Sequence, residues 1–266
     1  MLSAKVPLDE LDDDQAVVPT YARRGLSQPV PRYELPENGM EPSSAYQLIH
    51  DELALDGNPT LNLATFVTTW MDGEADRLMA ETANKNAIDW DEYPQCVELQ
   101  DRCVNMLSRL YSAPEDARTI GCATVGSSEA IHLGGLAMKW RWKAAAEAAG
   151  RALGRPNLVM GANVQVCWEK FARYFDVEPR YVPLTRDRFI IGVDEAMALV
   201  DENTIGVVGI LGSTYTGEYE PIAELSAALD ERQAKDGLDV PIHVDAASGG
   251  FVAPFLQPEL LWDFRL

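Results

Sequence analysis

The stretch IHVDAASGG, residues 242–250, reads as a short apolar strand that ends in a carboxylate and continues into small residues. Side chains alternate along a strand, so His243 and Asp245 are expected to share one face of a sheet. Ile242 and Val244 are expected on the other face. The small residues that follow are expected to leave open space beside Asp245. The stretch therefore predicts a polar site at the carboxyl end of a buried strand.

Asp245 needs a cation in such a place, because a carboxylate withdrawn from water is costly unless it is paired. One chemistry that supplies the cation is the protonated pyridine nitrogen of pyridoxal 5'-phosphate (PLP), with Asp245 holding the ring as an electron sink. The alternative is that Asp245 caps the following loop, while Ala247, Gly249 and Gly250 make a tight turn. Taken alone, the stretch leaves both interpretations open.

The chain around this stretch alternates between helical patterns and short β-rich runs. This alternation is typical of an α/β domain with a mostly parallel sheet. The expected elements are helix 129–149, strand 158–160, helix 164–174, strand 180–183, helix 193–200, strand 205–211, helix 222–234 and strand 242–245. In such sheets binding sites form outside the carboxyl ends of the strands, which is where Asp245 is expected.

A GSSE run, residues 126–129, stands directly before the longest of these helical patterns. Backbone N–H groups, the hydroxyls of Ser127 and Ser128 and the positive end of the helix converge there, so the run is a candidate phosphate cradle. A plain helix N-cap made by either serine with Glu129 is the alternative. The presence of the Asp245 strand in the same chain favours the phosphate cradle.

Two further polar residues follow predicted strands. Gln165 comes after the strand at 158–160, and Thr214 comes after the strand at 205–211. Both positions belong to the edge where α/β sheets build their binding sites. Taken alone, Gln165 is an ordinary polar residue of a helix face and Thr214 a turn hydroxyl. They become site candidates only together with the other motifs.

The part of the chain before the α/β pattern differs in composition. Residues 1–42 are rich in proline and acidic residues and show little hydrophobic periodicity, which indicates an extended or conditionally ordered arm. Helical patterns then fill residues 43–110. Residues 111–266 are expected to form a partial α/β domain. Its carboxyl-terminal part is expected to be missing, because the apolar segment 260–266 has no expected packing partner.

The composition narrows the classes of function. The 266 residues carry 22 Lys and Arg against 42 Asp and Glu, a formal charge of -20, which argues against a nucleic-acid partner because phosphates would be repelled. No apolar run approaches the roughly 20 residues that cross a bilayer, and the acidic start is unlike a signal peptide. A cytoplasmic protein without membrane contact is expected. The four cysteines are scattered, which predicts reduced thiols and no metal site.

Several motifs together resemble bacterial and plant glutamate decarboxylases, which belong to the group II decarboxylases among fold-type-I PLP enzymes. The resemblance runs from about Ser43 to Leu266 and implies a PLP-dependent transferase-like large domain, with a mostly parallel sheet flanked by helices. Its motifs are LNLATF at 61–66, NKN at 84–86, DEYP at 91–94, GSSEA at 126–130, MKWRW at 138–142, NVQVCWEKF at 163–171, TYTG at 214–217 and HVDAASGGF at 243–251.

The resemblance implies a role for each matching residue around the cofactor. Ser127 and Ser128 are implied to bind the phosphate of PLP. Asp245 is implied to pair with the pyridine nitrogen, and Gln165 to stack on the ring face away from the substrate. These two are the implied catalytic residues. Thr214 is implied to lie beside the cofactor.

Further residues follow from the same resemblance. Ala247 is implied to pack beneath the ring. Thr65, Phe66, Asn86 and Asp89 are implied to form the pocket for the distal carboxylate of L-glutamate, which in the family is completed across a dimer interface. Self-association into a dimer or higher homo-oligomer is therefore expected. The implied reaction removes the α-carboxylate of L-glutamate as CO2 and leaves 4-aminobutanoate.

The chain departs from the family pattern at the lysine that holds the cofactor covalently. The family places that lysine in a Ser-Gly-His-Lys run soon after WDFRL, here residues 262–266, whereas the last lysine of this chain is Lys235. These 266 residues alone are therefore expected to hold PLP weakly and to be inactive. Two alternatives are another fold-type-I amino-acid decarboxylase and a noncatalytic fragment that dimerises with, or regulates, a full-length copy.

Overall fold

The computed structural model describes residues 33–35, 39–58, 61, 71–115 and 119–266. Contacts within the chain divide it into two compact units, residues 1–73 and 74–266. The first unit contains helix α1 (Pro42–Leu53), which begins with a proline in its first turn. A proline is accepted there because the first turn needs no N–H from it. Most of the expected arm lies outside the described residues.

Two helices precede the α/β part of the second unit. Helix α2 (Gly73–Thr82) begins at the boundary of the units, and α3 (Pro94–Leu110) again starts on a proline. Both lie within residues 43–110, where the sequence predicts helical patterns, so helices are confirmed there. The turn between them is the NKN and DEYP region of the sequence.

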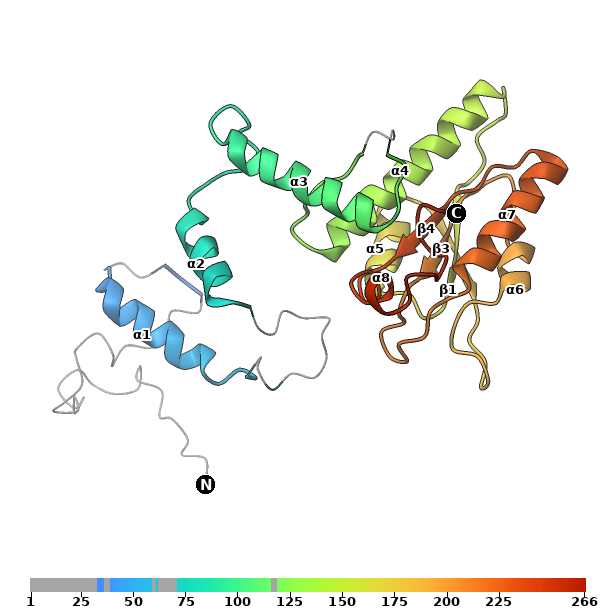
Figure 1. Ribbon diagram of the computed structural model, residues 1–266. Coiled ribbons are helices and arrows are strands. Elements are labelled where there is room, and N and C mark those ends of the chain that lie inside the picture. The colour runs from blue at the N-terminus through green and yellow to red at the C-terminus, as the bar shows by residue number, and fades with distance from the viewer. Residues whose placement is uncertain (1–32, 36–38, 59–60, 62–70, 116–118) are drawn as a thin grey trace. The chain divides into compact units, whose positions relative to one another are not determined.

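A four-stranded parallel sheet organises the second unit (Figure 1). Its strands lie in the order β2-β1-β3-β4, and every neighbouring pair is parallel. Each expected strand is confirmed, with ends that differ by one or two residues at most. The strands are β1 (Asn157–Gly161), β2 (Glu178–Val182), β3 (Thr204–Ile210) and β4 (Ile242–Asp245).

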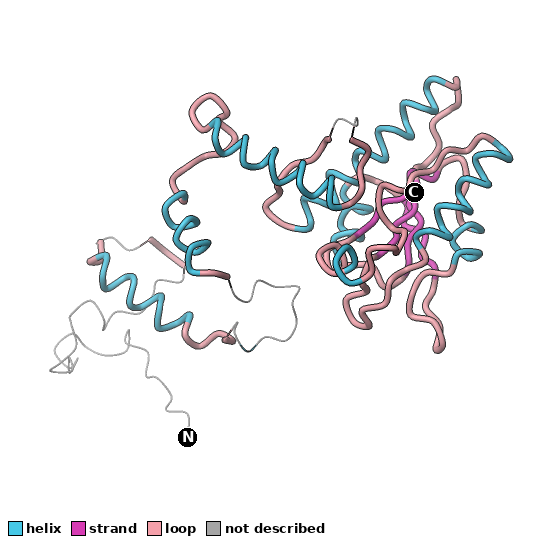
Figure 2. The backbone as a smooth tube through the Cα atoms, viewed as in Figure 1, coloured by secondary structure: helices cyan, strands magenta, loops and turns pink. Residues whose placement is uncertain are grey.

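Helices cover both faces of this sheet, so the expected α/β architecture is confirmed (Figures 1 and 2). One face carries α4 and α5, and the other carries α6 and α7. A short helix, α8, follows β4. The bounds are α4 (Ser127–Ala148), α5 (Val166–Tyr174), α6 (Val193–Ala198), α7 (Ile222–Asp236) and α8 (Ala253–Leu256).

Two apolar layers of the core lie on the two faces of the sheet, and a third, smaller cluster contains Leu211, Ile222, Ala253 and Trp262. Leu158 and Met160 of β1 pack with the α4 and α5 side, whereas Val159 between them packs with α6 and α7. All three side chains are fully buried, and each contributes roughly 1.5–3 kcal/mol by leaving water. A strand buried on both faces is the reason why these runs are continuously apolar instead of alternating.

The register of β3 contains an irregularity that the hydrophobic pattern does not reveal. Asn157 pairs with Thr204 but Leu158 pairs with Gly206, so one extra residue, Ile205, is inserted in β3. A bulge of this kind changes which face the following side chains point to. Ile205 accordingly lies in the same core layer as Val208.

The segment at 260–266 has a packing partner, contrary to the sequence-based expectation. Trp262 is buried, and its ring meets that of Tyr111 edge to face with the centroids 5.0 Å apart. The backbone N–H of Phe264 donates to the Tyr111 carbonyl at 3.1 Å. The residue after α3 thus receives this apolar segment, while the side chains of Phe264 and Leu266 stay exposed.

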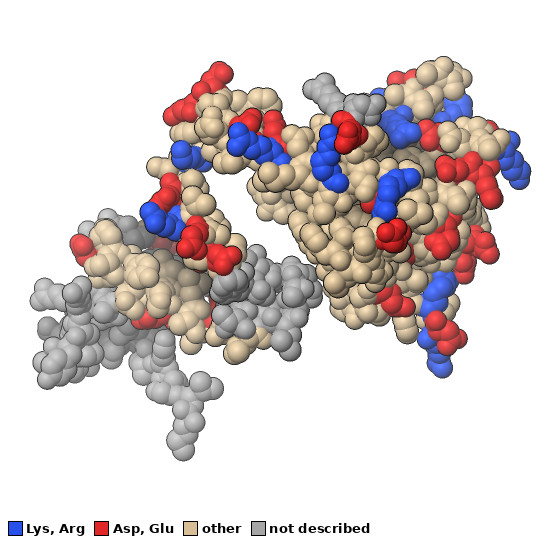
Figure 3. Space-filling model, viewed as in Figure 1, with Lys and Arg blue, Asp and Glu red and all other residues tan. Residues whose placement is uncertain are grey.

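The described residues also show how charges are distributed on the surface, how apolar the helices are and whether potential metal ligands are grouped. On the face shown in Figure 3, acidic side chains are interspersed with basic ones. Among the described helices, none combines the length and the apolar character that crossing a membrane requires. Within the same part of the chain, no group of three or more His, Cys, Asp and Glu side chains is placed to hold a metal ion.

Candidate active site

Asp245 is the last residue of β4, and each of its carboxylate oxygens accepts a hydrogen bond from a neutral donor. The indole N–H of Trp168 donates to Oδ2 at 3.1 Å, and the backbone N–H of Ala247 donates to Oδ1 at 3.3 Å. None of the ion pairs between described residues includes Asp245. The half-buried carboxylate therefore caps its loop and still has its charge available for a cation.

His243 shares a face of β4 with Asp245, as the strand alternation predicts. Its ring meets the Trp168 ring edge to face, with the centroids 4.8 Å apart. Gly134 of α4 makes room for it, because a Cβ at that position would lie 2.7 Å from His243 Cε1. Burial lowers the pKa of His243 and outweighs the opposing effect of Asp245, so the imidazole is held neutral near pH 7.

Gln165 and Thr214 meet at the same edge of the sheet. Gln165 lies directly before α5, and its side-chain amide donates to the Thr214 hydroxyl at 2.5 Å. Thr214 follows β3, so the contact joins the loops after β1 and β3. The structure thus brings together two side chains that the sequence separates by 49 positions.

Helix α4 runs opposite to the strands, which places its amino end past their carboxyl ends. Gly134 lies beside His243 of β4, and further along the helix Met138 lies against Gly206 near the start of β3. Still further along, the Trp142 indole donates to the Glu202 carbonyl, before β3 begins. Ser127 precedes Gly134 by seven residues, or roughly 10 Å of helix at 1.5 Å per residue.

The serines at this helix end do not act as its N-cap. Gly126 is the N-cap residue, and no side chain makes the capping hydrogen bond. Glu129 instead accepts a hydrogen bond from the Val125 backbone N–H at 2.7 Å. The hydroxyls of Ser127 and Ser128 therefore stand at the positive end of a 22-residue helix without an N-cap role. The plain N-cap alternative is wrong.

The small residues after Asp245 serve close packing instead of leaving open space, which corrects the sequence-based expectation. Gly249 donates its backbone N–H to the Leu211 carbonyl at 2.8 Å. A Cβ on Gly249 would lie 2.4 Å from that same oxygen, and one on Gly250 would lie 2.8 Å from the Ala246 carbonyl oxygen. The loops after β3 and β4 therefore touch, while Ala247 stays exposed at the site.

Glu220 is a buried residue of this edge that the sequence reasoning missed. Its carboxylate accepts hydrogen bonds from the Ile210 N–H at 2.7 Å, the Asn163 side-chain amide at 3.0 Å and the Ile191 N–H at 3.1 Å. Burial raises its pKa against the effect of these donors, and Asp245 adds to the rise. A glutamate before Pro221 looks like an ordinary helix-start residue, so the sequence contained no signal for this role.

The implied substrate residues are not assembled by the described part of the chain. Asn86 and Asp89 are exposed in the turn between α2 and α3, where they bond to nearby backbone. Asn86 Oδ1 accepts from the Ile88 N–H at 3.3 Å, and Asp89 Oδ1 from the Glu92 N–H at 3.0 Å. Thr65 and Phe66 lie outside the described residues. Their role as a glutamate pocket stays a prediction.

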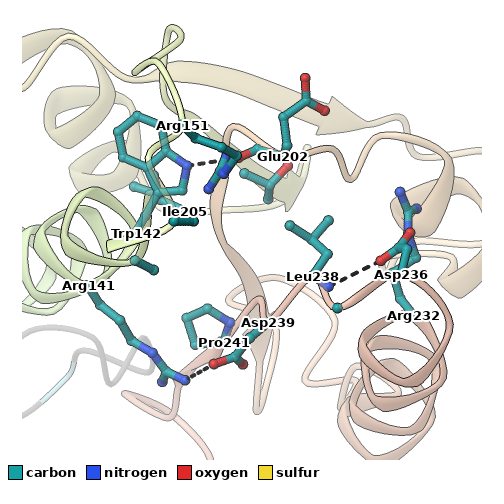
Figure 4. A pocket seen from close by; sticks show the side chains of 14 residues that line it. Arg141, Trp142, Arg151, Glu202, Ile205, Arg232, Asp236, Leu238, Asp239 and Pro241 are labelled. Carbon is teal, nitrogen blue, oxygen red and sulfur yellow. Dashed lines mark hydrogen bonds and ion pairs between the residues drawn. The ribbon is translucent and has the colours of Figure 1, made fainter. Parts of the chain in front are cut away.

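A hollow of about 380 Å³ lies at the opposite edge of the sheet, near the amino ends of β3 and β4 (Figure 4). Three arginines line this hollow, but each of them already interacts with a carboxylate or a backbone carbonyl. Arg141 pairs with Asp239 at 2.5 Å, and Arg151 donates to the Glu202 carbonyl at 2.9 Å. Arg232 pairs with an aspartate of its own helix. Parallel sheets bind ligands at the other edge, where Asp245 lies.

Comparisons with known proteins show the family to which the chain belongs. A family model described as "Pyridoxal-dependent decarboxylase conserved domain" matches residues 33–266. Glutamate decarboxylase 5 of Arabidopsis thaliana is 55% identical over 257 residues, which are 96% of this chain and 52% of that protein. Glutamate decarboxylase of Aliivibrio fischeri is 51% identical over 258 residues, 97% of this chain and 54% of that protein.

Solved structures show the same relation. The glutamate decarboxylase of Lactobacillus brevis superimposes with a TM-score of 0.88 at 46% identity, over 93% of this chain and 57% of that one. A sphingosine-1-phosphate lyase of Burkholderia pseudomallei, 22% identical with a TM-score of 0.73, shares the fold. The chain spans about half the length of the curated relatives it matches. With glutamate decarboxylases among its relatives, the chain belongs to the pyridoxal-dependent decarboxylase family.

Proposed function

We propose that this chain binds PLP at the carboxyl edge of its sheet and serves the decarboxylation of L-glutamate to 4-aminobutanoate and CO2. The observation that carries the proposal is the Asp245 carboxylate. It is half-buried, and two neutral donors orient it, but no cation pairs with it among the described residues. A half-buried carboxylate of this kind is stabilised when a ligand brings the missing positive charge.

The residues present fit PLP at both of its ends. At one end, Ser127, Ser128 and the first backbone N–H groups of α4 offer donors and a positive dipole to a phosphate. At the other end, Asp245 offers an acceptor to a protonated ring nitrogen. Both groups lie on the carboxyl side of the strands, because α4 runs opposite to them and passes beside His243.

Each residue of the edge has a part in the proposed reaction. Bound PLP would supply an electron sink for the charge that the departing CO2 leaves behind. Asp245 would hold a proton on the ring nitrogen, because a carboxylate beside that nitrogen would stabilise its protonated form. Gln165 is proposed to lie against the ring, steadied by its hydrogen bond to Thr214. Ala247 is small and exposed, and is proposed to pack beneath the ring.

Glutamate is the proposed substrate because relatives that are 51–55% identical over the matched residues are glutamate decarboxylases. Thr65, Phe66, Asn86 and Asp89 are proposed to bind its distal carboxylate. This chain covers about half the length of each relative, so the proposed activity is that of the whole protein.

Self-association is also proposed, on the basis of helix α1. Tyr46, Ile49 and Leu53 fall at positions i, i+3 and i+7, which form one face of a helix, and they are 67%, 53% and 61% exposed. An apolar helix face in water favours a protein partner, and a second copy of the protein is the proposed one. Analytical ultracentrifugation measures the oligomeric state directly. A protein that stays strictly monomeric across the micromolar concentration range would contradict the proposed self-association.

The proposed function is tested in two steps. PLP is first titrated into the purified protein by equilibrium dialysis, with Asp245→Asn and the double variant Ser127→Ala/Ser128→Ala expected to bind it at least tenfold more weakly. Asp194→Asn, which removes an exposed charge from α6 on the other face, is the matched control and should bind normally.

The second step measures CO2 and 4-aminobutanoate from L-glutamate, using the protein at its natural length. L-Aspartate and aromatic amino acids serve as competing substrates. Unchanged glutamate together with turnover of another amino acid would replace this proposal by a different decarboxylase. PLP binding without turnover of any amino acid would favour a noncatalytic partner.

A further inference from the structure

Trp168 is the residue through which α5 touches the candidate site. It lies in the first turn of the helix after Gln165, and its side chain is fully buried. A buried indole N–H requires an acceptor, and the acceptor here is Asp245 Oδ2. The ring also contacts His243 and Phe171, edge to face in both cases, with centroid separations of 4.8 Å and 6.3 Å.

The Trp168 indole is tightly held, because its two aromatic neighbours, His243 and Phe171, pack directly against a pair of glycines on α4. A Cβ on Gly134 would lie 2.7 Å from the His243 ring, and one on Gly135 would lie 2.5 Å from the Phe171 ring. Both rings therefore sit directly on the α4 backbone. Trp168 is fixed from both sides, and so is the carboxylate that it bonds.

This packing also links the two ends of the proposed cofactor site. Helix α4 carries Ser127 and Ser128 at its amino end and holds His243 against Gly134. His243 contacts Trp168, which bonds Asp245. The separation between the proposed phosphate cradle and the Asp245 carboxylate is thus set by a continuous series of close contacts.

Trp168 and His243 are both neutral neighbours of Asp245. An indole N–H orients a carboxylate without neutralising it, whereas a lysine or arginine would form an ion pair. His243 is kept uncharged by burial, as described above. Asp245 is therefore oriented by neutral donors and has no ion-pair partner among the described residues, so a cationic ring nitrogen can pair with it.

We infer that Trp168 is a positioning residue: its indole N–H aims the Asp245 carboxylate at the protonated nitrogen of an aromatic ring, here that of PLP. The inference rests on the proposed function, since it assumes PLP at this edge. It adds a role for a residue that makes no proposed contact with the cofactor.

The test compares Trp168→Phe with Trp142→Phe in the purified protein. Trp142 is the matched control, because it is also buried and donates its N–H, but to the Glu202 carbonyl far from the site. The probes are PLP and an analogue with carbon in place of the ring nitrogen, each titrated by equilibrium dialysis. Trp168→Phe is expected to bind PLP about tenfold more weakly, a change of about 1.4 kcal/mol, and the analogue within twofold of the wild-type protein.

The outcomes separate the inference from the function on which it rests. If the wild-type protein prefers PLP to the analogue and Trp168→Phe keeps the same preference, the inference is overturned and the proposed function stands. Equal weakening toward both probes also overturns it, because Trp168 then acts on general packing. If the wild-type protein binds neither probe, the proposed function fails and the inference fails with it.

A second measurement covers the case in which Trp168→Phe does not fold. The wild-type protein is labelled with 15N-tryptophan, and the Trp168 indole signal is identified as the one displaced in Asp245→Asn. That signal is expected to shift on addition of PLP and to stay in place on addition of the analogue. If PLP binds but the Trp168 indole signal does not shift, Trp168 and the ring nitrogen are not coupled through Asp245.

Discussion

Replacing Glu220 by alanine should destabilise the protein without touching the proposed cofactor residues. The side chain is 4% exposed, and its two oxygens serve three donors: the buried Ile210 and Ile191 N–H groups and the partly buried Asn163 amide. A buried donor that loses its acceptor costs about 1–3 kcal/mol. Relief of the buried charge and entry of water offset part of that cost. We expect the free energy of unfolding to fall by about 2–3 kcal/mol.

The pH dependence gives the same substitution a second signature. The pKa of Glu220 in the folded protein is raised above its ordinary value of 4.5 by burial. A group with a raised folded pKa stabilises the folded state below its unfolded pKa and loses that contribution as pH rises through the folded pKa. The difference in stability between wild type and Glu220→Ala should therefore narrow as pH rises from about 4.

Urea denaturation followed by circular dichroism at several pH values measures both effects. Glu218→Ala is the matched control, because it removes the same chemical group two residues away from an exposed side chain. Its stability should stay within about 0.5 kcal/mol of wild type. A Glu220→Ala variant that is equally close to wild type, with no change in pH dependence, would refute the assignment of Glu220 as a shared acceptor.

Three further substitutions test other contacts. Asp201→Asn should lower stability at pH 7 by about 1 kcal/mol. Burial raises the pKa of this carboxyl, but its hydrogen bonds together lower it, so its contribution is lost as pH falls through the folded pKa. Urea denaturation should show a smaller difference at pH 3 than at pH 7, and an equal difference at both would contradict it. Gly135→Ala should cost about 1–3 kcal/mol, because its Cβ would lie 2.5 Å from the buried Phe171 ring; an unchanged urea midpoint would show that the ring yields freely. Gly249→Ala should push the loop after β4 away from the Leu211 carbonyl and weaken PLP binding severalfold in equilibrium dialysis, whereas wild-type affinity would mean that this loop contact does not position the site.

The parts of the fold that could be predicted are those that local physics determines. Short β-rich runs of three to seven residues predicted the strands, and the helical patterns between them indicated parallel pairing. The alternation along β4 placed His243 and Asp245 on one face, and the structure confirms it through their shared neighbour Trp168. The placement of Gln165 and Thr214 after strands predicted one common edge, where they meet.

Several features of the site could not be predicted, because they depend on how distant elements pack. The bulge at Ile205 arises from pairing between β1 and β3, which leaves no trace in the hydrophobic pattern of either strand. Glu220 has three donors drawn from separate parts of the chain. The close packing of Gly249 against Leu211 could not be predicted either. A small residue in a sequence is equally compatible with close packing and with open space.

The sequence by itself determined the α/β architecture and the edge of the sheet on which polar residues collect, since periodicity, turn residues and strand ends are local properties of the chain. The family follows from the similarity of the sequence to its relatives. Only the tertiary structure decided how Asp245 is held. Its donor Trp168 lies 77 positions away in the sequence, and the two meet because α5 packs against the same side of the sheet that β4 presents to it. A hydrogen bond between such distant residues depends on the complete packing of that layer, which no local pattern records.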